Sequence, residues 1–326
     1  MRIDPGVRPA VLAALYLTIS ELGLYEAAAI FGAFPTYVAR FVVMTVACLA
    51  AFAVIRQQAP SLRNLTVWPY LIRSLLFTTT TILLILAFST SPSLNHTYTI
   101  FMLHIGAAYL IARLPLPLTE PLTKGRLWDW PFALAIVVLL IGIYLYHFVA
   151  AEPNPDPEVA AAGFRATVFA ALAAVSFAAS NIMATVFQRE RVRGVEGRAL
   201  SSLEVTFLGS IVALVVAPVI AVMLRVSITP EVVDSVQPTV ALAFLVWAVL
   251  AGTLSLPANN LLITAFNRTS NPALVSSMDA LVIVFAIVPD LLWHGVPAAS
   301  LLGTKGIGLA LILVGAVWAI YRDARR

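Results

Sequence analysis

Long apolar runs alternate with short polar breaks along the whole sequence. Each run covers about 18 to 24 positions, which an α-helix needs to cross a hydrocarbon layer of ~30 Å. Lipid offers no hydrogen-bond partner to an unpaired backbone amide, so each run predicts a membrane-spanning helix. The ten predicted helices are Pro9–Phe31, Tyr37–Ile55, Trp68–Phe88, Thr97–Leu114, Trp130–Phe148, Ala166–Phe187, Ser202–Leu224, Thr239–Phe266, Ala273–Trp293 and Leu301–Tyr321.

Composition supports an all-α integral membrane protein. Hydrophobic residues make up 61% of the 326 positions and charged residues 11%, against roughly 45–50% and 25% in soluble domains. No water-soluble fold could bury so much apolar surface. Cys48 is the single cysteine, so the chain can form no intrachain disulfide, and the four scattered histidines predict no metal site.

The placement of basic residues predicts the orientation in the membrane, because Lys and Arg concentrate on the cytoplasmic side. With a cytoplasmic N-terminus, the outside keeps four basic residues: Arg40, Arg165, Arg225 and Lys305. The remaining 16 of the 20 Lys and Arg residues fall on the inside. An even number of helices places both termini in the cytoplasm. The excess of basic over acidic residues therefore indicates the membrane surface and not nucleic acid as the partner.

The ten predicted helices divide into two halves. Residues 151–164 form an acidic, proline-rich break, interpreted as an extracytoplasmic linker between a first repeat over residues 1–150 and a second over 165–326. Aligning Gly142 with Gly315 matches the fifth predicted helix with the tenth. An odd number of helices per half inverts the second copy, which is the plan of many secondary transporters. The sequence thus predicts two inverted five-helix repeats.

The C-terminal quarter carries a family resemblance. The stretch from Asn271-Pro-Ala-Leu-Val-Ser-Ser-Met-Asp279 to Gly315, a polar helix followed by a glycine-rich one, resembles the last two helices of the EamA-type drug/metabolite transporters. Pro35 followed by Arg40 resembles that family's second-helix entry, and Glu120 resembles the acidic end of its fourth helix. The Trp-Gly or Trp-Ser signature of the family's first helix is missing. The resemblance implies ten helices in two repeats and transport of a small solute.

Two ionisable residues lie deep in predicted helices. An ionisable side chain at mid-membrane costs at least ~2.5–3.5 kcal/mol, so it needs a partner, a cavity or a function. Asp279 in the ninth helix and His104 in the fourth occupy corresponding places in the two halves. One hypothesis places both in a central cavity, where Asp279 holds a substrate ammonium or a proton. The alternative ties each to neighbouring hydroxyls, such as those of Ser276 and Ser277, for packing alone.

The first helix carries two further acids, Glu21 near its middle and Glu26 nearer its outer end. Arg40 enters the second helix from that outer side, so equal depth predicts an ion pair between Glu26 and Arg40, either structural or part of an outer gate. Glu21 has no obvious partner at its depth. It is therefore predicted to bind cargo or a coupling proton in the cavity.

Uncharged polar side chains complete the candidate cavity. Thr78 opens a run of four threonines in the third helix, and Asn259 and Asn260 follow Pro257 in the eighth. A proline-broken helix beside side-chain amides is typical of a cavity lining, and Asn181 in the sixth helix is predicted to share that space. The alternative is that these groups bond their own backbone or neighbouring helices.

These patterns favour a secondary transporter, not an enzyme. It would move a small polar or amphipathic metabolite, with export and proton coupling as options, and it contains no Walker loop for ATP. No catalytic residue, cofactor or metal is predicted. The expected partners are the solute and the lipid bilayer of a cell inner membrane, with the chain as a monomer or homodimer. The rivals are an intramembrane lipid-modifying transferase and a non-transporting membrane assembly subunit.

Overall fold

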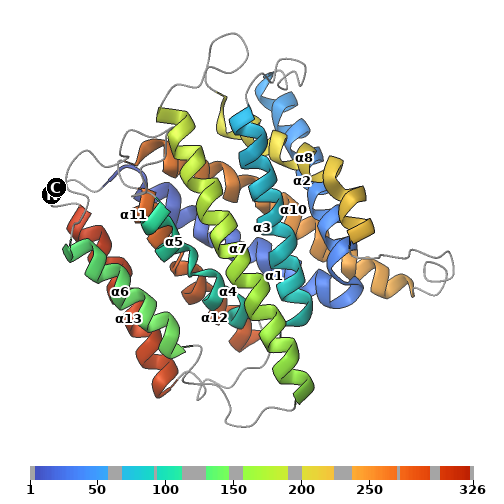
Figure 1. Ribbon diagram of the computed structural model, residues 1–326. Helices are drawn as coiled ribbons and strands as arrows, with labels where there is room; N and C mark the ends of the chain where they lie inside the picture. Colours follow the sequence, from blue (N-terminus) through green and yellow to red (C-terminus); the bar gives the residue numbers. More distant parts are fainter. Residues whose placement is uncertain are drawn as a thin grey trace.

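The computed structural model shows a bundle of α-helices (Figure 1). It describes residues 4–57, 68–91, 94–111, 130–146, 157–189, 200–223, 237–269, 272–293 and 302–323. Within these ranges there is no strand, which confirms the all-helical prediction for this part of the chain. The helices are α1 Val7–Phe31, α2 Ala33–Ile55, α3 Trp68–Thr90, α4 Leu94–Phe101, α5 His104–Ile111, α6 Trp130–Tyr144, α7 Pro157–Arg189, α8 Ser202–Met223, α10 Pro238–Arg268, α11 Pro272–Met278, α12 Leu281–Leu292 and α13 Thr304–Asp323.

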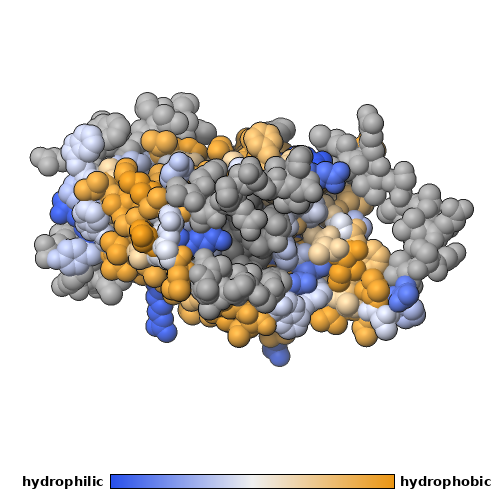
Figure 2. Space-filling view, turned by 90° about the horizontal axis from the view of Figure 1, so that it is seen from below, coloured by the Kyte–Doolittle hydropathy of each residue, from blue (hydrophilic) through white to orange (hydrophobic). Residues whose placement is uncertain are grey.

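The helices are those of a multi-pass membrane protein. Among the described residues, seven helices are long and apolar enough to cross a bilayer: α1, α2, α3, α7, α8, α10 and α13. Three shorter apolar segments, Thr97–Ile111, Trp130–Tyr144 and Leu274–Pro289, fall on the other three predicted spans. Large hydrophobic areas lie on the outer surface (Figure 2). Exposed apolar side chains include Val46 and Val54 of α2 and Val317 of α13.

Two of the predicted helices are interrupted. The fourth is divided into α4 and α5 at Met102 and Leu103, and the ninth into α11 and α12 at Asp279 and Ala280. At both breaks the backbone tightens into three-residue steps, such as Leu103 N to Ile100 O at 3.0 Å and Asp279 N to Ser276 O at 3.2 Å. Such 3₁₀ steps inside a helix often mark a functional hinge.

Helix α7 begins earlier than predicted. It starts at Pro157, so the described part of the supposed linker over residues 151–164 is helical rather than irregular. Proline suits the first turn of a helix, because its missing N–H would have no intrahelical partner there. Residues 151–156 and Glu120 lie outside the described ranges.

Helices α1 and α2 are joined by a single residue. Gly32 has φ +80° and ψ −177°, a conformation essentially restricted to glycine, and its N–H donates to Ala28 O at 2.8 Å. Helix α2 therefore begins at Ala33, four residues before the predicted Tyr37. This early start places Arg40 about 6 Å deeper along the helix, at ~1.5 Å per residue.

Helix pairs recur in the bundle. Helix α1 packs on α10 and α3 packs on α7; α2 packs on α10 and α3 packs on α8. Helices α6 and α13 lie side by side at one edge (Figure 1). The interrupted helices contact each other through opposite halves, because α4 lies against α12 and α5 against α11. Their two breaks are thereby brought together inside the bundle.

Glycine permits close contact between α6 and α13. A Cβ at Gly142 would lie 2.6 Å from Gly308 O, and one at Gly315 would lie 2.8 Å from Ala135 O. Small residues allow helix backbones to approach closely inside a membrane, where packing replaces the hydrophobic effect as the driving force. The α6–α13 pair is thus a backbone-to-backbone seam.

Candidate functional site

A narrow cavity lies among α1, α2, α3, α4, α7 and α10, beside the break between α11 and α12. The empty space around its lining residues, including the part that opens to the outside, is about 470 Å³. Most of the lining is apolar. The polar lining residues are Glu21, Arg40, Thr80, Thr81, Tyr98, Asn259 and Asp279.

An ion pair closes one side of the cavity. The Arg40 guanidinium donates to Glu21 Oε1 at 3.1 Å through Nη2 and to Ser255 Oγ at 3.0 Å through Nε. Both charged side chains are only 3% exposed. A buried arginine and a buried carboxylate neutralise each other, which offsets much of the cost of removing each from water.

The observed pair corrects two sequence predictions. Arg40 pairs with Glu21 and not with Glu26, and Glu21 therefore has the partner that the sequence did not reveal. Because α2 begins at Ala33, Arg40 lies deeper than expected, and its long side chain reaches the middle of α1. Glu26 remains half-buried and does not line the cavity.

A second buried pair joins the two helix breaks. His104 Nε2 lies 3.0 Å from Asp279 Oδ2, with side chains 0% and 1% exposed. His104 is the first residue of α5, and Asp279 follows the last residue of α11. Asp279 is thus bonded to His104, whereas the Ser277 hydroxyl donates to Leu274 O. The Ser276 hydroxyl has no hydrogen-bond partner among the described residues, so the alternative in which the Ser276 and Ser277 hydroxyls hold Asp279 in place is wrong.

Three buried oxygen atoms of the lining residues have no hydrogen-bond partner among the described residues. They are Glu21 Oε2, Asp279 Oδ1 and the Tyr98 hydroxyl. Each pair therefore uses one carboxylate oxygen internally and leaves the other unbonded. A buried polar atom without a partner carries a full desolvation cost, so such atoms mark places where a ligand or water can bind.

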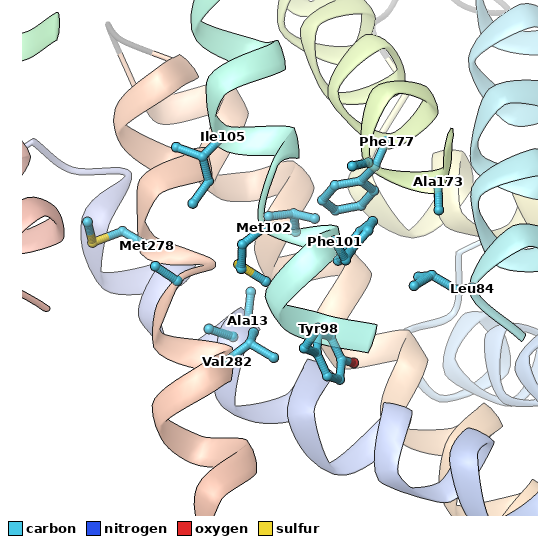
Figure 3. Close-up of a cluster of buried hydrophobic side chains, with 14 of the residues drawn as sticks. Ala13, Leu84, Tyr98, Phe101, Met102, Ile105, Ala173, Phe177, Met278 and Val282 are labelled. Atoms are coloured by element: carbon cyan, nitrogen blue, oxygen red, sulfur yellow. The ribbon is translucent and has the colours of Figure 1, made fainter. Parts of the chain in front are cut away.

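Aromatic rings form part of the cavity lining. Phe101 and Phe177 lie against each other, with ring centroids 5.1 Å apart, and Leu84 and Tyr98 lie nearby (Figure 3). Phe77 of α3 also contributes to the lining. The lining therefore combines the charged groups Glu21, Arg40 and Asp279 with apolar rings.

Asn259 is the other predicted residue that lines the cavity. Its amide donates to Ser255 O at 2.8 Å, so part of its hydrogen-bonding capacity serves its own helix. Thr80 and Thr81 also donate to carbonyls four residues earlier, as the packing alternative expects. These hydroxyls can still accept a hydrogen bond from a ligand.

Other predicted site residues lie away from the cavity. The side-chain oxygen of Asn260 accepts a hydrogen bond from Thr206 at 3.0 Å, which joins α10 to α8. Asn181 and Thr78 are buried but do not line the cavity. The structure therefore places Glu21, Arg40, Asn259 and Asp279 on the lining, and His104 directly behind Asp279.

Sequence reasoning missed Tyr98 and Phe177. Tyr98 was predicted to be the second residue of its helix, where a tyrosine usually anchors at the lipid interface. Helix α4 begins earlier, at Leu94, and Tyr98 is fully buried. Its position one turn before Phe101 on the same helical face was the available signal.

A second arginine is buried inside the bundle. Arg73, which was predicted to lie on the cytoplasmic side, is part of α3 and 3% exposed, with its guanidinium carbon 5.6 Å from the Phe77 ring centroid. The Ser180 hydroxyl of α7 donates to its carbonyl oxygen at 3.4 Å. This arginine belongs to the packing of α3 on α7, beside but not on the cavity lining.

Comparisons with known proteins bear on the fold alone. No protein-family model matches the sequence, and no curated protein matches it. Twenty-seven chains among the solved structures are similar. One of them, described only as the crystal structure of a protein, has 15% identity and a TM-score of 0.65 over 98% of this chain and 99% of its own. The fold therefore has an experimental counterpart of the same extent.

Proposed function

We propose that this chain is a secondary transporter that moves a small amphipathic metabolite by alternating access, and that it resembles the EamA-type drug/metabolite transporters. The observation that carries the proposal is the cavity itself. Buried carboxylates from α1 and from the α11–α12 break line one internal space and leave Glu21 Oε2 and Asp279 Oδ1 without protein partners among the described residues. Ionisable groups inside a membrane bundle mark solute and ion pathways.

The proposal includes ten spans in two inverted five-helix repeats. The recurring helix pairs support it, because exchanging the first five spans with the last five converts the α1–α10 pair into the α7–α3 pair. Two hydrogen bonds are exchanged as well: the Ser20 hydroxyl donates to Ala251 O at 2.9 Å, and that of Ser176 to Leu76 O at 2.8 Å. Ala251 follows Leu76 by 175 residues, the interval that separates His104 from Asp279.

The three shorter apolar segments complete the ten spans in this scheme. Helices α4 and α5 form one interrupted span, α11 and α12 form the other, and α6 pairs with the full-length α13. Interrupted helices at equivalent positions of two repeats are a common way to build a transport site near the middle of the bilayer. Orientation follows from the basic residues, so we place both termini in the cytoplasm and the protein in a cell inner membrane.

The mixed lining of the cavity favours an amphipathic cargo. Glu21 Oε2 can accept a hydrogen bond from an ammonium or hydroxyl group, while Phe101 and Phe177 can cover an apolar portion. The cavity is narrow and its carboxylates are nearly inaccessible, with Glu21 2% and Asp279 1% exposed. This arrangement corresponds to a closed state that must widen to admit cargo.

The test begins with cargo identification. Purified protein is screened by thermal unfolding against a panel of amines, amino acids and sugars, because a ligand that binds the folded state raises its unfolding temperature. The compounds that stabilise the protein are then measured in proteoliposomes for saturable uptake that is accelerated by the same solute inside the vesicle. A carrier gives such acceleration; a channel, an assembly subunit or an enzyme does not. Absence of accelerated exchange for every stabilising compound refutes the proposal.

Matched variants connect the flux to the cavity. Glu21→Gln is expected to reduce exchange about tenfold or more, because a hydrogen bond to a charged group contributes about 1.5–3 kcal/mol. Glu26→Gln makes the same chemical change on the same helix outside the cavity lining, and it should leave exchange unchanged. Equal effects of the two substitutions would place the cargo elsewhere.

A further inference from the structure

The hydrogen bonds of the His104–Asp279 pair define how many hydrogens the pair carries. His104 Nδ1 lies 2.8 Å from Phe101 O. A carbonyl oxygen can only accept, so Nδ1 must carry hydrogen. One hydrogen must then lie between Nε2 and Asp279 Oδ2, which are 3.0 Å apart. It belongs either to an imidazolium facing a carboxylate or to a carboxylic acid facing a neutral imidazole, and the pair is neutral in both forms.

Removing that hydrogen destroys the contact. With Nδ1–H fixed by Phe101 O, a neutral imidazole presents the Nε2 lone pair to the lone pairs of the Asp279 carboxylate. The attraction becomes a repulsion, and the net charge of the pair changes from zero to minus one. A buried carboxylate without a partner is strongly disfavoured, so the pair must separate or admit water.

The pair connects the two helix breaks. His104 begins α5, and Asp279 lies between α11 and α12, which pack against α5 and α4. The breaks contain the three-residue backbone steps that allow a helix to bend. Asp279 Oδ1 belongs to a residue on the cavity lining and has no partner among the described residues, which provides an exit for the proton.

We propose that the His104–Asp279 pair is the binding site of a coupling proton, and that the bound proton holds the two interrupted helices together. The inference rests on the proposed transport function and deepens it. Loss of the proton to water in the cavity leaves neutral His104 and the Asp279 carboxylate, and the two breaks then move apart. Cargo binds separately, beside Glu21, so that the proton and the cargo use different carboxylates of one cavity.

The surroundings support a single titrating unit. The rings of Phe101 and Phe177 lie 5.0 Å from the imidazole ring and keep water away from it. The charged or titratable side chains that share the cavity with Asp279 are Glu21 of α1, Arg40 of α2 and Tyr98 of α4. The lining from α3, α7 and α10 is uncharged: Phe77, Thr80, Thr81, Leu84, Phe177, Ala258, Asn259 and Leu262. Glu21 and Arg40 neutralise each other, so the pair of Asp279 with His104 sets the net charge of the site.

The experiment measures access to the cavity as a function of pH. In a full-length Cys48→Ala background, Ala258→Cys introduces a thiol on the cavity lining. Its rate of reaction with a membrane-impermeant methanethiosulfonate is followed from about pH 6 to about pH 9, around the ordinary range of histidine titration. Each rate is divided by that of the same protein carrying Asp279→Asn, which cancels the ionisation of the thiol.

The reference variant Asp279→Asn should keep the two helix breaks together at every pH. Asp279→Asn supplies a side-chain amide that can donate to Nε2 of neutral His104, so this substitution keeps the contact as the pH rises. We expect the ratio of the two thiol reaction rates to rise about tenfold with pH. The population then shifts from molecules whose helix breaks are in contact to molecules whose breaks have moved apart. The same rise is expected when both proteins also carry Glu21→Gln. A ratio that stays constant, or a rise abolished by Glu21→Gln, overturns the inference.

A second measurement covers the case in which Asp279→Asn does not fold. His104→Gln also supplies a pH-independent donor to Asp279 and serves as the alternative reference. Independently, the ¹⁵N spectrum of His104 should show hydrogen on Nδ1 throughout the titration, and a neutral form with hydrogen on Nε2 alone would refute this count of hydrogens. A pH-dependent ratio without metabolite exchange removes the transport proposal, and exchange with a constant ratio removes only the proton site.

Discussion

Removing one member of the buried ion pair should cost more than removing both. Arg40→Met takes away the guanidinium and leaves the Glu21 carboxylate, 3% exposed, without its cation. Leaving one member of a buried pair uncompensated costs about 3–5 kcal/mol. Protonation of Glu21 limits the loss, because a carboxylic acid is cheaper to bury than a carboxylate, so we expect about 3 kcal/mol.

The double variant isolates the interaction between Glu21 and Arg40. Glu21→Leu combined with Arg40→Met replaces the pair with apolar side chains of similar volume, an exchange that is often close to neutral. The second substitution should therefore recover most of the stability lost in the first. Because each single variant leaves a buried charge unpaired at a cost of about 3 kcal/mol, the four-protein cycle should give a coupling free energy of about 5 kcal/mol, well above the ~0.5 kcal/mol within which independent substitutions add.

The assay is reversible unfolding of the purified protein in mixed micelles at increasing dodecyl sulfate, followed by circular dichroism. The control cycle pairs Arg40→Met with Glu26→Leu, because Glu26 lies on the same helix but does not pair with Arg40. Effects that add within about 0.5 kcal/mol in the Glu21 cycle would refute the ion-pair reasoning. Equal coupling in both cycles would attribute the effect to general charge instead of to this contact.

Three further outcomes are expected. Gly142→Val places a side chain against the Gly308 carbonyl oxygen, which lies 2.6 Å from an added Cβ, so it should lower stability by about 1–3 kcal/mol in the same unfolding assay. The control Gly163→Ala has nothing within 4 Å of its Cβ and should not lower stability. Tyr98→Phe removes a buried hydroxyl without a partner among the described residues, so stability should hold or rise while exchange slows, and a loss of stability would show that the hydroxyl is satisfied. A fluorescent protein that folds only in the cytoplasm should give a bright signal when it is fused to the C-terminus. A well-expressed but dark fusion would contradict the cytoplasmic C-terminus.

Run length predicted the seven described helices that are long enough to cross a bilayer, because the bilayer fixes how many apolar residues a span requires. Depth arguments also succeeded in part. His104 and Asp279 were matched from their positions in the two halves, and they lie 3.0 Å apart. Depth failed for Arg40, because a one-residue connection at Gly32 starts α2 earlier than the hydrophobic pattern suggests. A shift of one turn changed which glutamate the arginine reaches.

The helix breaks could not be predicted from local sequence. Neither Met102-Leu103 nor Asp279-Ala280 contains glycine or proline, the residues that usually interrupt a helix. The interruptions arise where the two chain segments cross and exchange a side-chain hydrogen bond, which is a tertiary effect. The same limit applies to the cavity: composition indicates polar groups in the membrane, but which of Asn259 and Asn260 faces inward depends on helix rotation.

Because the glycine seam holds α6 and α13 in close contact, this helix pair can serve as a fixed reference for motion elsewhere in the protein. Sliding one helix along the other by a turn, about 5.4 Å, would replace Gly142 opposite Gly308 with a residue whose Cβ meets backbone. Spin labels on the outward faces of these two helices should therefore keep a constant separation while distances to α1 or α7 change. Displacements throughout the molecule can then be expressed relative to this pair, independent of detergent, lipid or cargo.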